Sequence, residues 1–182
     1  MPILGAKYII AMDIFLRHFS LYIIPIAGLV PLLVGAMWYS PALFGKVWMR
    51  VSGVTEEQVQ AGGMMKIFAL TYIFGVLAAY MLAFATVHQF SFIQLFFLDP
   101  SLSDPTSEFS RITAEYMDKF GQRHRTFGHG LIHGFENGLL ISLAMIGIPA
   151  LFERKPWKYI CIHVGFWTVN FALMAGILCQ FL

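Results

Sequence analysis

Four long apolar segments divide the chain, and each is long enough to cross a lipid bilayer. A bilayer core of about 30 Å requires about 20 helical residues, and an isolated spanning segment must be helical to satisfy its backbone hydrogen bonds. The pattern therefore predicts an all-α fold, a four-helix transmembrane bundle. Pro25 and Pro31 lie inside the first segment, where we expect them to kink the helix rather than end it. The predicted spans cover residues 20–44, 66–90, 127–152 and 158–182.

The short link at residues 45–65 carries the pattern of a small surface helix. Thr55 followed three residues later by Gln58 is typical of a capping box, in which each side chain bonds the backbone of the other residue. Gly62 and Gly63 are suited to end that helix, because glycine adopts the left-handed backbone at little cost.

The long connection at residues 91–126 carries an amphipathic pattern at about residues 105–120. Asp104 and Pro105 are suited to the N-cap and the first helical position, and Gly121 is suited to the C-cap. Such a helix would lie on the membrane or over the bundle, or else dock a partner. Its apolar side chains recur at spacings of three and four, at Phe109, Ile112, Tyr116 and Phe120.

Composition supports lipid as the solvent for most of the chain, and we expect residues 1–182 to form a single membrane domain. Hydrophobic residues make up 58% of the sequence and charged residues 12%, against about 25% charged residues in soluble domains. Residues 1–18 are expected to lie in the membrane interface, because charged residues interrupt their apolar run and no signal-peptide cleavage site follows. The net charge of +2 gives no indication of nucleic-acid binding.

The positive charges favour an orientation with the two short links in the cytoplasm and both termini outside. Lysine and arginine residues are equally frequent on the two faces, but those in the short links crowd close to helix ends, where the positive-inside rule acts. These are Lys46, Arg50, Lys66, Arg154, Lys155 and Lys158.

A short internal repeat indicates two helical hairpins of the same orientation. The sequence Pro-Ala-Leu-Phe ends the first predicted span at residues 41–44 and the third at residues 149–152. Each copy is followed by a basic residue and then a tryptophan. Either the hairpins are related by a pseudo-two-fold axis along the membrane normal, or the repeat is a chance similarity in an apolar sequence.

Two stripes with a spacing of four residues run along the third predicted span. Gly130, Gly134 and Gly138 would form a groove that lets another helix approach closely. Ionisable residues inside a membrane are costly and are functional candidates by default. We expect a polar cluster from the second stripe and its neighbours in the bundle, composed of His88, His129, His133, Glu136, Asn137 and Asn170.

Three interpretations of this polar cluster remain open. The side chains bond across helices and fix packing, or they carry a proton or ion path, or His129, His133 and Glu136 bind a metal ion or haem. His18, His124 and His163 are isolated in the sequence and are interpreted as interface or packing residues. No nucleophile triad or dinucleotide-binding fingerprint occurs, which disfavours an enzyme.

The sequence from Trp38 to Trp48, WYSPALFGKVW, followed by Thr55-Glu56-Glu57, resembles the family labelled domain of unknown function 1761. The run Arg154-Lys155-Pro156-Trp157 is similar to the second half of that family, so the resemblance covers roughly residues 25–182. The resemblance implies a small multi-pass protein of the bacterial cytoplasmic membrane with four spans, and it implies no activity.

We therefore predict an accessory or self-assembling membrane subunit, forming a homo-oligomer or part of a membrane complex, without a cofactor. The alternatives are a transporter of small ions, protons or solutes that uses the polar cluster, and a metal- or haem-binding membrane protein.

Overall fold

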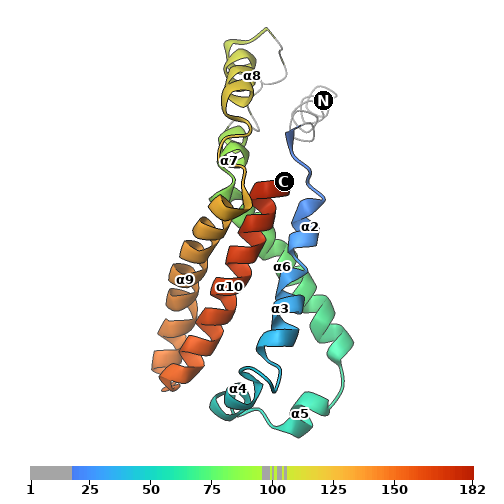
Figure 1. The fold of residues 1–182 in the computed structure, drawn as a ribbon, viewed down its shortest axis with the longest axis vertical. Coiled ribbons are helices and arrows are strands. Elements are labelled where there is room, and N and C mark those ends of the chain that lie inside the picture. Colours follow the sequence, from blue (N-terminus) through green and yellow to red (C-terminus); the bar gives the residue numbers. More distant parts are fainter. Residues whose placement is uncertain (1–17, 96–98, 100, 102–103, 105) are drawn as a thin grey trace.

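The computed structural model describes residues 18–95, 99, 101, 104 and 106–182. Within these residues all regular structure is helical. Figure 1 shows an elongated molecule in which long helices run side by side. The predicted interfacial segment at residues 1–18 lies outside the described residues except for His18.

In the part of the chain that the structure describes, three helices are long and apolar enough to cross a membrane: α6 (Met64–Thr86), α9 (Phe127–Phe152) and α10 (Trp157–Phe181). The predicted spans at 127–152 and 158–182 agree with α9 and α10 to within one residue. The second predicted span is shorter than expected, because the extended backbone of Val87 ends α6 and a separate helix follows. That helix is α7 (His88–Gln94).

The first apolar segment does not form one continuous span. It forms two helices, α2 (Ile23–Ala27) and α3 (Val30–Trp38), which are separated at residues 28–29. Pro31 lies near the start of α3, where it has no N–H to donate to the carbonyl of Ala27 and its ring crowds that carbonyl. Gly28 and Leu29 keep helical backbone angles between the two helices, so the interruption is local. The apolar stretch Ile23–Trp38 is shorter than the candidate spans α6, α9 and α10.

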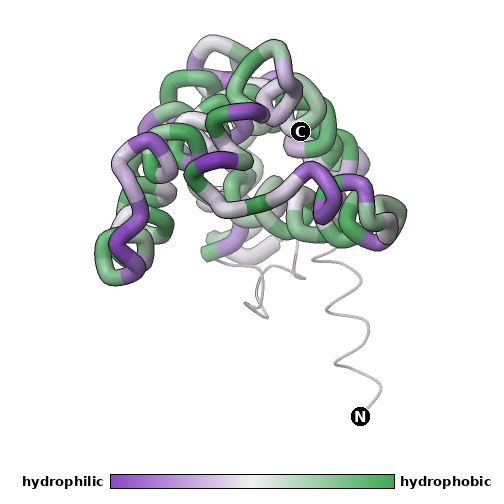
Figure 2. Tube along the Cα trace, turned by 90° about the horizontal axis from the view of Figure 1, so that it is seen from below, coloured by the Kyte–Doolittle hydropathy of each residue, from purple (hydrophilic) through white to green (hydrophobic). Residues whose placement is uncertain are grey.

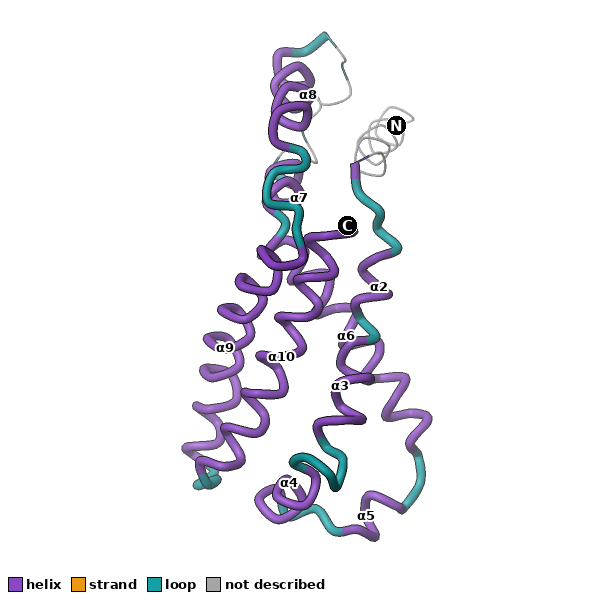
Figure 3. The backbone as a smooth tube through the Cα atoms, in the orientation of Figure 1, coloured by secondary structure: helices purple, strands orange, loops and turns teal. Residues whose placement is uncertain are grey.

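The two short surface helices follow the predicted capping pattern. After the turn at residues 40–44, α4 (Gly45–Ser52) and α5 (Glu56–Gln60) form one end of the molecule (Figure 3). The Thr55 side chain accepts a hydrogen bond from the Gln58 backbone, and the Gln58 side chain accepts one from the Thr55 backbone, which confirms the capping box. Gly62 and Gly63 adopt positive φ angles of 90° and 80° and lead into α6.

The predicted amphipathic helix is α8 (Glu108–Phe120), and it stands beyond the ends of α9 and α10 (Figure 1). Its N-cap is Ser107, whose hydroxyl accepts a hydrogen bond from the Ser110 backbone, rather than the predicted Asp104. The Asp104 carboxylate instead closes a local turn by accepting hydrogen bonds from Thr106. Gly121 is the C-cap, as predicted.

α10 lies between α9 and the other long elements, and it packs against α9, α6, α3 and α2 (Figure 1). The buried core consists mainly of small and aliphatic side chains near the C-terminal end of α10, including Ala27, Ala83, Met174, Ala175 and Leu178. Small side chains at helix contacts let backbones approach closely, which is a common way for helices to associate in lipid.

The outer surface of the long helices is apolar. Phe74 and Met81 on α6, and Ile132, Leu140 and Phe152 on α9, are all exposed large hydrophobic residues. Viewed from the α4–α5 end, hydrophobic residues make up much of the helical trace (Figure 2). An apolar surface of this extent indicates a lipid environment rather than water.

The three glycines of the third span face α10. A Cβ atom added to Gly130 would lie 2.2 Å from the carbonyl oxygen of Ala175, and one added to Gly134 would lie 2.2 Å from that of Phe171. A Cβ atom on Gly138 would lie 2.7 Å from the Cα atom of Thr168. Only hydrogen atoms fit in these positions, so the glycines set the separation of α9 and α10.

Candidate metal centre

Three histidines gather where the end of α6, the start of α7 and the start of α9 meet, and we call them the histidine cluster: His88, His129 and His133. His88 is the first residue of α7, placed there by the extended Val87. His129 lies in the first turn of α9, where its backbone N–H donates to the N-cap side chain of Thr126. His133 follows one helical turn later.

The nitrogen atoms of this cluster are close enough to share a metal ion. One ring nitrogen from each of the three histidines lies within 4.8 Å of the others. The Nε2 atoms of His88 and His129 are 3.2 Å apart, and the rings of His129 and His133 have centroids 4.5 Å apart. His88 is exposed, and His129 and His133 are half-buried, so an ion could reach the cluster from outside.

A fourth imidazole stands beside the cluster, and it corrects the interpretation of His124 as an isolated residue. The ring of His124 stacks on that of His129, with centroids 4.8 Å apart and an interplanar angle of 21°. His124 adopts a positive φ of 62°, a conformation in which histidine is enriched several-fold among non-glycine residues. Its position five residues before His129 is the only signal in the sequence, and the loop conformation that brings the rings together carries no sequence pattern.

The surroundings of His88, although its side chain is partly exposed, favour the neutral form of the ring that binds metals. Burial lowers the pKa of His88, and the nearby His133 and His124 lower it further, because a positive charge on one ring disfavours a second.

Two other predicted residues lie next to the cluster rather than in it. The Glu136 Oε2 atom is 3.6 Å from Nδ1 of His133, and the Glu136 side chain is 61% exposed in the single chain. The Asn137 amide donates a hydrogen bond to the His133 carbonyl of its own helix. Because a charge facing lipid is costly, Glu136 would be expected to face the protein interior. In the single chain its side chain is instead largely exposed, and His133 is its polar neighbour.

Asn170, another residue of the predicted polar cluster, makes its hydrogen bond within its own helix. It is fully buried in α10, and its side-chain nitrogen donates to the carbonyl of Phe166 at 2.6 Å. This i to i−4 bond uses the amide nitrogen within α10, and the buried side-chain oxygen has no hydrogen-bond partner among the described residues. The structure thus gathers the three histidines, with Glu136 and Asn137 beside them.

The Trp38–Trp48 motif docks the first half of the chain onto α10. The indole N–H of Trp38 donates to the carbonyl of Ile162 at 3.1 Å, and the Tyr39 hydroxyl is hydrogen-bonded to Nδ1 of His163 at 3.1 Å. Gly45 has no room for a side chain, because a Cβ atom would lie 2.4 Å from the Tyr39 carbonyl oxygen. The motif residues Trp38 and Tyr39 therefore bond the neighbouring helix α10.

The apolar long helices and the polar cluster at their ends define a small helical membrane protein. The chain belongs to the family described as protein of unknown function DUF1761, which matches residues 23–179. No curated protein and no solved structure matches the chain.

Proposed function

We propose that this protein binds a divalent transition-metal ion at the histidine cluster and resides in the bacterial cytoplasmic membrane. The observation that carries the proposal is the convergence of three imidazole nitrogens within 4.8 Å. Imidazole is a preferred ligand of zinc, copper, iron and nickel, and three histidines form a recognised zinc site with one open position.

The distance between two ring nitrogens fits a metal ion well. Nitrogen ligands at 2.0–2.1 Å from a tetrahedral zinc ion lie about 3.3 Å apart. The Nε2 atoms of His88 and His129 are 3.2 Å apart, so they need little movement to bind one ion together. The third nitrogen lies within 4.8 Å and reaches the ion by a small rotation of its side chain.

Glu136 supports the site as an orienting residue. Metal-binding histidines commonly donate their other ring N–H to a carboxylate, which fixes the ring and the tautomer. The Glu136 carboxylate faces Nδ1 of His133 at 3.6 Å, which leaves Nε2 of that ring for the ion. Glu136, predicted as a ligand from the sequence, thus fits this supporting role better.

Zinc titration of the purified, metal-free protein tests the proposal. Calorimetry should show one zinc ion per chain, and His129→Ala should weaken binding by more than about 100-fold, the upper range for losing an outer-shell partner. Glu136→Gln should weaken it by about tenfold. His18→Ala is the matched control, since it removes an exposed histidine elsewhere. Equal zinc affinity of the wild type and His129→Ala would refute the site.

A second candidate function is self-assembly, favoured by the exposure of Glu136. This residue lies about 13 Å along α9 from Phe127, at 1.5 Å per residue, and 61% of its side chain is exposed in the single chain. A charged side chain facing lipid at mid-membrane costs about 2.5–3.5 kcal/mol on the insertion scale. A second copy that covered this face would remove the cost.

Light scattering in a neutral detergent tests self-assembly. The wild type should have the mass of an oligomer, and Glu136→Leu should shift it toward the monomer because the polar contact is lost. Leu140→Ala, at an exposed position one turn further along α9, should keep the oligomer. A monomeric wild type would be incompatible with this function.

The helix contacts also support a two-hairpin arrangement, which we propose as the origin of the four-residue repeat. α6 and α10 contact each other, and the α2–α3 segment and α9 each contact both of them, as a two-fold axis between α6 and α10 requires. The two repeat copies differ locally, since residues 41–44 form a turn and residues 149–152 end α9. An experimental structure in which a rotation of about 180° leaves α9 far from α2–α3 would contradict the symmetry.

A further inference from the structure

Two adjoining cavities lie at the α4–α5 end of the molecule, far along the chain from the histidine cluster. The inner one has a volume of about 560 Å³ and lies between α3, α6 and α10. The outer one has a volume of about 340 Å³ and lies between the α3–α4 turn and α5. Tyr39, Trp48 and Val59 line both, so the two cavities share a wall.

The inner cavity is suited to an alkyl chain. Its lining is largely apolar and includes Pro31, Leu32, Phe68, Phe74 and Phe166. Two of the elements that line it, α6 and α10, are candidate membrane spans. A volume between 300 and 1,000 Å³ with apolar walls is typical of small-ligand sites.

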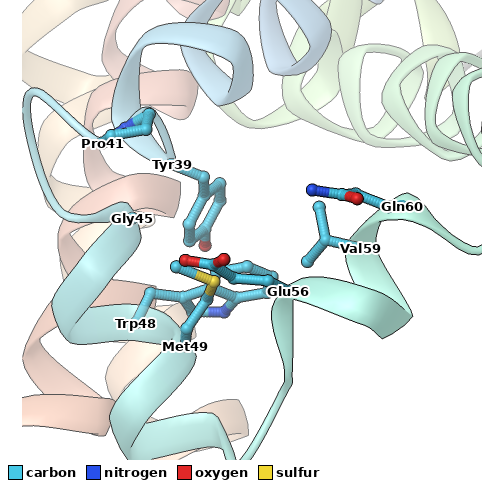
Figure 4. A pocket seen from close by; sticks show the side chains of 8 residues that line it. All are labelled: Tyr39, Pro41, Gly45, Trp48, Met49, Glu56, Val59 and Gln60. Atoms are coloured by element: carbon cyan, nitrogen blue, oxygen red, sulfur yellow. The ribbon is translucent and has the colours of Figure 1, made fainter.

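The outer cavity presents a carboxylate beside two aromatic rings. Figure 4 shows the Glu56 side chain extending from α5 toward Tyr39, Trp48 and Met49. The rings of Tyr39 and Trp48 have centroids 5.2 Å apart at an angle of 57°. The structure gives Glu56 no hydrogen bond or ion pair with the described residues, so its negative charge is available to a ligand.

The aromatic wall is held in place before any ligand binds. The Tyr39 hydroxyl is hydrogen-bonded to His163 on α10, and the Tyr39 ring packs against Phe166 with centroids 5.2 Å apart. Gly45 lets the chain pass tightly under Tyr39, as described above. Because the aromatic wall is already ordered, its side chains lose less entropy when a ligand binds.

We propose that the paired cavities bind an amphiphilic organic cation. Its cationic head group lies between Glu56 and the faces of Tyr39 and Trp48, and its alkyl chain occupies the inner cavity. Aromatic faces attract quaternary ammonium groups through the ring quadrupole, and the carboxylate adds a full opposite charge. A neutral lipid chain would use only the inner cavity and would gain nothing from Glu56.

Binding of radiolabelled dodecyltrimethylammonium to the full chain in lipid nanodiscs tests the proposal, with empty nanodiscs as background. The wild type should show saturable binding to one site, stronger than that of uncharged dodecanol. Glu56→Gln should weaken cation binding by about tenfold and leave dodecanol binding unchanged. Trp48→Leu should weaken cation binding as well.

Glu57→Gln is the matched control. Glu57 follows Glu56 in the first turn of the same helix and is also exposed, but it does not line the cavity. This variant should bind the cation as the wild type does. Equal cation affinity of the Glu56→Gln and Glu57→Gln variants overturns the proposal, as does equal affinity of the wild type for the cation and dodecanol, or the absence of saturable binding.

Discussion

Replacing Gly134 by leucine is expected to separate α9 from α10 and to remove the cooperative unfolding transition of the protein. A Cβ atom at this position would lie 2.2 Å from the Phe171 carbonyl oxygen and 2.7 Å from the Ala172 Cα atom. These are backbone atoms of a packed helix, which cannot rotate away as a side-chain tip can. Overpacking typically costs about 1–3 kcal/mol and sometimes more, and a whole leucine side chain belongs at the upper end. Thermal unfolding in detergent, followed by fluorescence, measures the effect.

A pair of alanine variants separates the glycine contact from a general effect on α9. Gly134→Ala should lower the melting temperature clearly, because the first added carbon already meets the α10 backbone. Gly147→Ala places its Cβ atom 3.7 Å from Leu143 Cδ1, an ordinary contact, and alanine favours the helix by up to about 1 kcal/mol. Equal melting temperatures for the two variants would show that the close approach of α9 and α10 does not matter for stability.

The sequence predicted the long helices well where the capping residues and the apolar pattern indicate the same helix bounds. α9 begins at Phe127 and ends at Phe152, as predicted, because a threonine N-cap and a charged turn bound a long, mostly apolar run. The prediction of one continuous span for the first segment was wrong for a physical reason. Apolar composition shows only that a segment can lie in lipid, whereas the backbone near Pro31 lacks a hydrogen bond and interrupts the helix.

The candidate site was predictable only in part. His129 and His133 lie one turn apart on one helix, so their proximity follows from helical periodicity alone. His88 was expected in the same polar cluster, and its Nε2 atom lies 3.2 Å from that of His129. His124 was missed because its own left-handed backbone conformation in the loop brings its ring to His129. Asn170 was included from its position in the sequence, but its amide nitrogen bonds the backbone of its own helix.

Zinc affinity is expected to fall steeply with acidity, by up to about three orders of magnitude between pH 7.5 and 5.5. Metal binding requires neutral imidazoles, and a histidine with the usual pKa near 6.5 loses about tenfold of its neutral form over this range. If three such histidines must all be neutral to bind zinc, the zinc affinity falls by up to the cube of this factor, about 1,000-fold. The pKa of His88 is lowered by burial and by His133 and His124. His88 therefore becomes protonated at a lower pH, and its contribution to the loss of zinc affinity begins at a lower pH.

The dependence on pH therefore distinguishes a histidine site from a carboxylate site. Calorimetric zinc titrations of the wild type should show zinc affinity falling as pH decreases through 6.5. The fall should be less steep than for three histidines with the usual pKa, because the lowered pKa of His88 delays its protonation. His88→Ala removes one of the three proton-competing ligands, so its weaker binding should depend less steeply on pH. His18→Ala should follow the wild-type curve, since His18 lies outside the cluster. Affinity that stays constant from pH 7.5 to 5.5 would assign the bound zinc to carboxylates, which remain ionised throughout that range.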